Sequence, residues 1–175
     1  MLVMGLVLGG CGSKAAPPRN PLGSTATNKG FTNAVRCDAS QPGREMSMHD
    51  VSGRGKPDMV EVIAYRKSAG GGLEGHVVCV QLDTNHDGSL DVLRTFTDRS
   101  ELESEEADRN YDGRSDAWIY YEKGQISREV FDSDFDGRGD EFRYLRDGKL
   151  KRIERDRNHD GKPDCAYAPS YSSII

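Results

Sequence analysis

Oxygen-bearing side chains recur at a fixed spacing between residues 83 and 164. A nine-residue segment occurs four times, as DTNHDGSLD, DRNYDGRSD, DSDFDGRGD and DRNHDGKPD, over residues 83–91, 108–116, 132–140 and 156–164. We call these the first to fourth loops. Their starts lie 25, 24 and 24 residues apart, so the region is an internal repeat. Every copy has Asp at positions one, five and nine, Asn or Asp at position three, and Gly at position six.

This spacing suits a hard divalent cation. Ca2+ takes about six to eight oxygen ligands, which a loop can offer from alternate residues. Gly at position six permits the sharp turn, and position seven would offer a backbone carbonyl, so its side chain is free to vary. We therefore expect about four bound Ca2+ ions. The expected ligands are Asp83, Asn85, Asp87, Ser89 and Asp91; Asp108, Asn110, Asp112, Arg114 and Asp116; Asp132, Asp134, Asp136, Arg138 and Asp140; and Asp156, Asn158, Asp160, Lys162 and Asp164.

A turn without metal is the alternative interpretation of these loops. Asn-x-Asp-Gly is also a turn signal between two strands. A plain turn has no use for Asp three residues after its Gly, yet all four copies have one. We therefore favour metal binding.

The loops resemble the first half of an EF-hand loop, but an EF-hand requires Glu at position twelve. This sequence has Arg94, Ile119, Arg143 and Tyr167 there. The loops are more similar to the nine-residue calcium loops of integrin-type (FG-GAP) propeller blades, and loosely to thrombospondin type 3 repeats. The resemblance implies that the Asp at position nine is the bidentate ligand and that each loop joins two β-strands. It covers the loops only, because such blades have four strands per loop.

The segments between the loops predict paired β-strands. AWIYYEKGQISREVFD and EFRYLRDGKLKRIERD each contain two runs around a Lys-Gly or Asp-Gly turn. The pattern predicts an all-β fold, an antiparallel meander of about ten strands in repeated hairpins of about 24 residues joined by the calcium loops. It leaves open whether the sheet is flat, curled or propeller-like. One packed face is expected from positions that recur between repeats, namely Leu93, Trp118 and Phe142; Phe96, Tyr121 and Leu145; Leu102, Ile126 and Leu150; and Thr95, Tyr120 and Tyr144.

The start of the chain, MLVMGLVLGGC, resembles the end of a bacterial lipoprotein signal peptide, with Leu8 to Cys11 as the lipobox. The resemblance implies that residues 1–11 form the signal peptide with lipidated Cys11, and that the protein is anchored in the bacterial cell envelope, periplasmic or surface-exposed. Gly12 and Ser13 favour the outer membrane over the inner one. The alternative is a buried first strand.

The remaining chain divides into a tether and a folded domain. Residues 12–33 hold three of the seven prolines and few apolar residues, so we expect a disordered tether. Residues 34–175 are the expected β-repeat domain. They begin with a degenerate repeat over 50–58, DVSGRGKPD, in which Ser52 and Arg54 replace two ligands. The Arg54 guanidinium either pairs with Asp50 and Asp58 where the ion would lie or points into solvent.

Cysteines and histidines offer further chemistry. Apart from Cys11, three cysteines allow one disulfide, and Cys37–Cys79 is favoured over the pairings with Cys165 because it would tie the irregular start to the first hairpin. His86 and His159 occupy position four, which points away from the ion of their own loop. We expect ordinary surface histidines there, with a transition-metal role as the alternative.

Composition limits the classes of function. The 175 residues carry a formal charge of −5, with 30% charged and 35% hydrophobic residues, so one domain with a modest core is expected. No basic stripe interleaved with aromatic residues indicates nucleic-acid binding, and no catalytic arrangement of side chains indicates an enzyme. The expected function is that of a membrane-anchored calcium-binding module with a structural or adhesive role, with a surface protein or polysaccharide as its partner. The alternatives are a calcium-responsive switch or buffer, and the scaffold of a carbohydrate-active enzyme.

Overall fold

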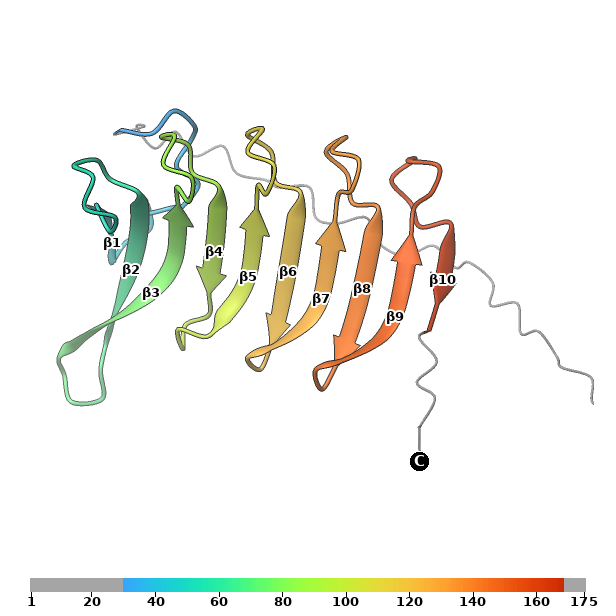
Figure 1. Cartoon of the computed structure of the whole chain (residues 1–175). Coiled ribbons are helices and arrows are strands. Elements are labelled where there is room, and N and C mark those ends of the chain that lie inside the picture. Colours follow the sequence, from blue (N-terminus) through green and yellow to red (C-terminus); the bar gives the residue numbers. More distant parts are fainter. Residues whose placement is uncertain (1–29, 169–175) are drawn as a thin grey trace, which may run out of the picture.

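The computed structural model describes residues 30–168, which form one antiparallel sheet of ten strands in sequence order (Figure 1). The predicted all-β meander is confirmed, and the sheet is open, with β1 and β10 as its edges. The expected signal peptide with Cys11, and residues 12–29 of the expected tether, lie outside the described residues. The strands are β1 (Arg44–His49), β2 (Met59–Lys67), β3 (Leu73–Leu82), β4 (Val92–Phe96), β5 (Leu102–Ala107), β6 (Ala117–Glu122), β7 (Gln125–Phe131), β8 (Glu141–Arg146), β9 (Lys149–Arg155) and β10 (Cys165–Tyr167).

Two short turns close the later hairpins as their sequences predict. Lys123 and Gly124 between β6 and β7 have φ of 52° and 74°, and Asp147 and Gly148 between β8 and β9 have φ of 53° and 68°. Positive φ at both central residues is the type I′ geometry, whose twist matches that of the flanking strands. Each hairpin therefore returns the chain to the same side, at which the nine-residue loops connect the strands.

All four loops and the degenerate loop connect the strands at one end of the sheet, and the turns connect them at the opposite end (Figure 1). A backbone hydrogen bond joins each loop to the one before it, because the N–H at position one donates to the carbonyl at position nine of the preceding loop. This fixes the loops in a row with a constant spacing. The bonds run from Asp83 N to Asp58 O (2.9 Å), Asp108 N to Asp91 O (2.8 Å), Asp132 N to Asp116 O (2.9 Å) and Asp156 N to Asp140 O (2.8 Å).

The apolar core lies at the β1–β4 end of the sheet. A segment that precedes β1 (blue in Figure 1) packs there, and its Cys37 forms a disulfide with Cys79 of β3. The Gln81 side chain accepts hydrogen bonds from the backbone N–H groups of Arg36 and Cys37 at 2.5 and 2.9 Å, which holds the segment in place. The buried cluster consists of Phe31, Val35, Cys37, Val60, Val62, Val78, Cys79 and Leu90.

Residues 31–33 belong to the folded part rather than to the tether in which the sequence analysis places them. Phe31 is 5% exposed in the core cluster. Thr32 N donates to the carbonyl of Gly88 at 2.8 Å, and Asn33 exchanges two side-chain hydrogen bonds with the backbone of Leu90, at 2.9 and 2.8 Å. These residues brace the first loop, so the expected boundary at residue 34 is too late.

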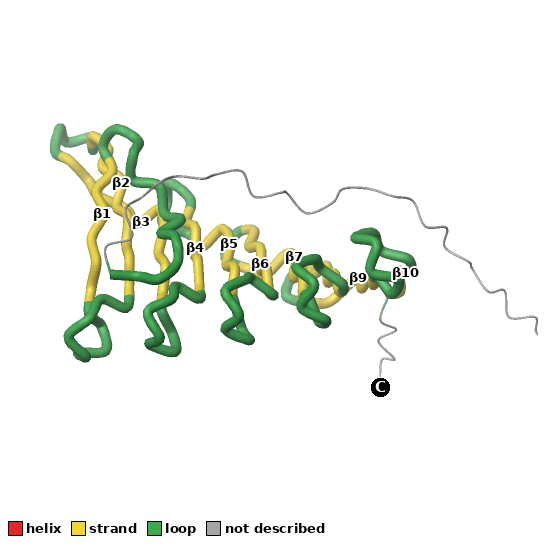
Figure 2. Tube along the Cα trace, turned by 90° about the horizontal axis from the view of Figure 1, so that it is seen from above, coloured by secondary structure: helices red, strands yellow, loops and turns green. Residues whose placement is uncertain are grey.

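Beyond β4 the described chain forms a single layer, which Figure 2 shows from above. Trp118, Val130 and Phe142 are direct cross-strand partners on one face. Tyr121 lies three residues after Trp118 on the same strand, so strand alternation places it on the opposite face. The expected single packed face is therefore wrong, since its residues divide between the two sides of the sheet.

Arginine side chains cover aromatic rings on both faces of this single layer. The Arg128 guanidinium lies 4.1 Å from the ring centre of Tyr120 on one face, and that of Arg143 lies 4.8 Å from Phe131 on the other. Such contacts contribute about 0.5–1 kcal/mol each at exposed sites. They shield apolar surface that has no second layer of structure to cover it.

Candidate metal centre

The four loops share one backbone conformation. Position four, which holds a side chain, lies in the left-handed region, with φ between 58° and 63°, and the Gly at position six also has positive φ, between 83° and 94°. These two residues in the left-handed region bend the chain back on itself. Of the two, only Gly adopts this conformation without a steric penalty. The carboxylates at positions one, five and nine consequently accept hydrogen bonds from backbone N–H groups of their own loop.

The Asp at position one is the buried base of each loop, between 4% and 7% exposed. One of its oxygens accepts a hydrogen bond from the N–H of the Gly at position six. The bonds run from Gly88 N to Asp83 Oδ2 (2.9 Å), Gly113 N to Asp108 Oδ2 (2.7 Å), Gly137 N to Asp132 Oδ2 (2.7 Å) and Gly161 N to Asp156 Oδ2 (2.7 Å).

The second oxygen of position one differs between loops. Oδ1 of Asp83 accepts from His86 N at 2.7 Å, and Oδ1 of Asp108 accepts from Asp112 N at 3.2 Å. Oδ1 of Asp132 and Oδ1 of Asp156 are buried and have no hydrogen-bond partner. A buried carboxylate oxygen without a donor is costly, so these two atoms are the first candidates for contact with a cation.

The Asp at position nine closes each loop by accepting hydrogen bonds from the N–H groups at positions two and three. Its first three copies, Asp91, Asp116 and Asp140, are buried, whereas Asp164 of the last loop is exposed. The bonds to position two run from Thr84 N to Asp91 Oδ2 (2.7 Å), Arg109 N to Asp116 Oδ2 (2.8 Å), Ser133 N to Asp140 Oδ2 (2.7 Å) and Arg157 N to Asp164 Oδ2 (2.8 Å).

Positions three, five and seven form the rim of each loop and are exposed, except for the half-buried Ser89. The N–H at position seven donates to the carboxylate at position five, at 2.7–2.9 Å for Ser89, Arg114, Arg138 and Lys162. In three loops the amide of Asn at position three also donates to that carboxylate. These bonds run from Asn85 to Asp87 (2.9 Å), Asn110 to Asp112 (3.1 Å) and Asn158 to Asp160 (3.4 Å).

The third loop has no such amide, because Asp134 replaces Asn. Asp132, Asp134 and Asp136 each offer a carboxylate oxygen, and the three oxygens lie within 4.8 Å of one another. Burial raises the pKa of Asp132, and the charges of Asp140 and Asp136 raise it further, whereas the nearby backbone N–H groups of Gly137 and Phe135 lower it. Only the Gly137 N–H forms a hydrogen bond, to Oδ2. Negative charge is thus more concentrated here than in the other loops, and a cation would relieve it.

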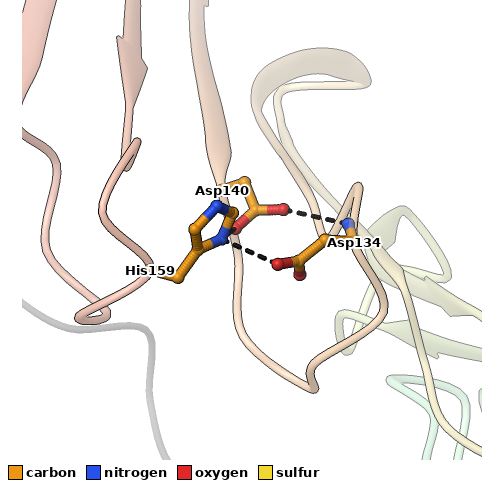
Figure 3. Close-up of side chains that lie close together, drawn as sticks. All are labelled: Asp134, Asp140 and His159. Carbon is orange, nitrogen blue, oxygen red and sulfur yellow. Dashed lines mark hydrogen bonds and ion pairs between the residues drawn. The ribbon is translucent and has the colours of Figure 1, made fainter.

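His159 of the fourth loop extends into the third loop. Its Nδ1 lies 2.8 Å from Asp134 Oδ2 and 3.3 Å from Asp140 Oδ1 (Figure 3). The charge of Asp134, followed by that of Asp140, raises the pKa of His159. As expected, His159 points away from its own loop, but it is not an ordinary surface histidine, since it contacts two predicted ligands of the neighbouring loop.

The degenerate loop keeps the same backbone bonds but has Ser52 and Arg54 in place of the expected ligands at positions three and five. Asp50 accepts from Gly55 N at 2.6 Å, and Asp58 accepts from Val51 N and Ser52 N at 2.7 and 2.8 Å. The Arg54 side chain is exposed and forms no ion pair with any residue between 30 and 168. The structure therefore favours the solvent-exposed alternative for Arg54 over a guanidinium in place of the ion.

Asp58 predicts a dependence of stability on acid pH. Hydrogen bonds from Ser52 and from the Val51 N–H lower the pKa of Asp58 to about 2. A depressed pKa stabilises the fold above the ordinary carboxyl pKa, and this contribution is lost as the pH falls from about 4 to 2. Asp58→Asn should therefore destabilise the protein at pH 7 and have a much smaller effect near pH 2, where Asp58 is about half protonated in the folded state. Urea unfolding across this range measures the difference, with Glu122→Gln as a surface control; a difference independent of pH would contradict the expectation.

Sequence reasoning singled out the recurring acidic positions of the loops but not the contacts around them. Thr32 Oγ1 lies 2.6 Å from Ser89 Oγ, and Thr84 Oγ1 donates to Asp91 Oδ2 at 2.8 Å. The recurrence of His at position four was visible, but only the spacing of adjacent loops shows that His159 reaches the third loop. None of residues 30–168 is helical, so this part contains no helix long and apolar enough to cross a membrane.

Comparison with known proteins identifies no family. No protein-family model matches the sequence, and no curated protein is significantly similar to it. Among solved structures, a crystal structure of accessory secretory protein 1,2 and 3 in Streptococcus pneumoniae aligns with a TM-score of 0.44 and 12% sequence identity. The alignment covers 68% of this chain and 20% of that chain. A likeness at this level establishes neither a shared family nor a shared function.

Proposed function

We propose that the protein is a calcium-binding β-repeat module of the bacterial cell envelope, in which four Ca2+ ions are structural parts of the loops. The observation that carries the proposal is the pair of buried oxygens, Asp132 Oδ1 and Asp156 Oδ1, that have no hydrogen-bond donor. Both belong to position one of a loop, and in the third loop one oxygen each of Asp132, Asp134 and Asp136 lies within 4.8 Å of the others. A dication is the partner that such an oxygen-rich loop would accept.

The distribution of backbone bonds supports the same interpretation. In every loop the Asp residues at positions one and nine each accept backbone N–H bonds, which orient their carboxylates before any ion arrives. Preoriented oxygen ligands lose little conformational entropy on binding. Extracellular calcium modules bind at about 10⁻⁴–10⁻³ M, so the loops would be filled outside cells and the ions would be structural.

We also propose that the module is anchored in the cell envelope and has a structural or adhesive role there. The Leu8–Cys11 lipobox would anchor the chain by lipid, with the outer membrane favoured, and the sheet would be presented on the periplasmic or external side. A single-layer sheet with two accessible faces suits a structural or adhesive role. Its partner would then be a surface protein or a polysaccharide.

Substitution of one buried oxygen tests the metal sites. Asp132→Asn keeps an acceptor for Gly137 N but replaces the unpartnered oxygen with an amide, so isothermal titration of Ca2+ into the full chain should show three sites instead of four. Asp50→Asn in the degenerate loop is the matched control, and it should leave four sites. A wild-type chain that binds no Ca2+, or an Asp132→Asn variant that still binds four ions, would contradict the proposal.

A further inference from the structure

We propose that the third loop, unlike the other three, is a site for a transition-metal dication such as Zn2+, with His159 of the fourth loop as a ligand beside Asp134 and Asp140. The inference deepens the proposed function, since it rests on the third loop holding a cation. It adds an imidazole nitrogen from another repeat to the ligand set. The choice of metal at this loop would then differ from that of its neighbours.

The geometry of the three groups fits a small dication. Zn2+ binds His nitrogen and carboxylate oxygen at about 2.0–2.2 Å, so two ligand atoms at tetrahedral or octahedral angles lie about 3.0–3.4 Å apart. His159 Nδ1 lies 2.8 Å from Asp134 Oδ2 and 3.3 Å from Asp140 Oδ1 (Figure 3). These atoms could therefore move onto one ion with shifts of a few tenths of an ångström.

Asp132 supplies an independent indication that a cation belongs at this loop. Its side chain is 4% exposed, and its Oδ1 has no hydrogen-bond partner. One of its carboxylate oxygens also lies within 4.8 Å of oxygens of Asp134 and Asp136, and His159 contacts the same Asp134. Asp134 thus belongs to two groups of close ligand atoms, one with Asp132 and Asp136 and one with Asp140 and His159.

Within residues 30–168, only the third loop combines a carboxylate at position three with a contact to a histidine of the next loop. In the other three loops, Asn at position three donates to the Asp at position five, and this amide takes up charge that the third loop leaves uncompensated. His86, the equivalent residue of the first loop, also reaches back, but to Asp58 of the degenerate loop at 3.8 Å. That loop has Ser52 and Arg54 at positions three and five, so it lacks the further carboxylates.

The ligand type decides which metal is favoured. Ca2+ is bound almost entirely through oxygen, whereas imidazole is a ligand of Zn2+ and of other first-row transition metals. Loss of the imidazole should therefore weaken Zn2+ binding and leave Ca2+ binding at this loop nearly unchanged. His86→Gln is a matched control, because it removes a histidine at the same position of a loop without affecting the third one.

Isothermal titration of Zn2+ into the full chain, with 1 mM Ca2+ present, provides the test. The background is Cys11→Ser with Cys165→Ser, which removes the thiols outside the disulfide as competing ligands. We expect one Zn2+ per chain, which displaces one of the four Ca2+ ions. His159→Gln should weaken the Zn2+ affinity by about tenfold or more, and His86→Gln should leave it unchanged.

X-ray absorption of the Zn2+-loaded chain is a second measurement that needs no variant. It should show nitrogen and oxygen ligands with the scattering pattern of an imidazole. Oxygen-only coordination, equal Zn2+ affinity in His159→Gln, or absence of Zn2+ binding would overturn the inference even if four Ca2+ ions bind. Zn2+ binding that depends on His159 in a chain that binds no Ca2+ would instead support this site and contradict the calcium proposal.

Discussion

Removal of calcium should lower the melting temperature of the full chain by about 12–24 °C. At 1 mM free Ca2+ and a dissociation constant of about 0.1 mM, each site stabilises the fold by RT ln 11, about 1.4 kcal/mol. Four independent sites together give about 6 kcal/mol, and each kcal/mol shifts the melting temperature by about 2–4 °C for a chain of this size.

The single-layer part of the sheet explains why the expected effect is so large. Beyond β4 the described strands have no second layer, and the core cluster lies wholly at the other end of the sheet. The ion-filled loops at one end of the strands would then contribute much of the free energy that holds β5 to β10 together. Without the ions, the repulsion between the carboxylates of a loop, strongest in the third, opposes that arrangement.

Differential scanning calorimetry in 1 mM Ca2+ and in EDTA measures this shift. Mg2+ at the same concentration is the control, and it should give a much smaller shift because it demands octahedral geometry and dehydrates reluctantly. We expect hydrogen exchange in EDTA to rise first in β8 to β10, which are farthest from the core cluster. Identical melting curves in Ca2+ and in EDTA would contradict the structural role of the ion.

Loss of the Cys37–Cys79 disulfide is expected to cost about 4 kcal/mol of unfolding free energy. The two cysteines are 42 residues apart in the sequence, and the chain-entropy estimate for a loop of that length gives this value. The bond also joins the segment before β1 to β3 within the buried cluster. Its loss should release this segment from the sheet and expose Phe31.

Chemical denaturation of the Cys37→Ala, Cys79→Ala double variant measures the cost. Cys165→Ala is the matched control, because Cys165 is a free cysteine on β10 and its removal should change stability by less than about 1 kcal/mol. A double variant as stable as the wild type would show that Gln81 and the apolar contacts alone hold the segment. Tryptic cleavage before residue 44 should accelerate in the double variant but not in the control.

Much of the fold follows from local patterns in the sequence. Two-residue turns at Lys123 and Asp147 and the nine-residue loops each set the length of a connection, and connections that alternate in this way predict a meander with all loops at one edge. The disulfide between Cys37 and Cys79 matches the favoured pairing. The turns and loops depend on neighbouring residues, so a single sequence is enough to predict them, whereas the disulfide joins residues 42 apart and was chosen among three possible pairings.

Features that depend on distant residues were not predictable in the same way. Phe31 follows a stretch rich in Pro and Gly, and its burial depends on a surface assembled from β2, β3 and the first loop. The contact of His159 with Asp134 depends on the distance between adjacent loops, which the backbone bonds of the loop row determine. Division of the apolar residues between two faces follows from strand alternation, which an alignment of repeats does not show.

A crystal structure of the full chain grown in Ca2+ would test the central claim most directly. The account predicts four ion peaks, one in each of the loops 83–91, 108–116, 132–140 and 156–164, with Asp132 Oδ1 and Asp156 Oδ1 as ligands, and no peak in the degenerate loop 50–58. Loops without ion density, in which Asp132 Oδ1 is bonded to water or to a backbone N–H instead, would contradict it.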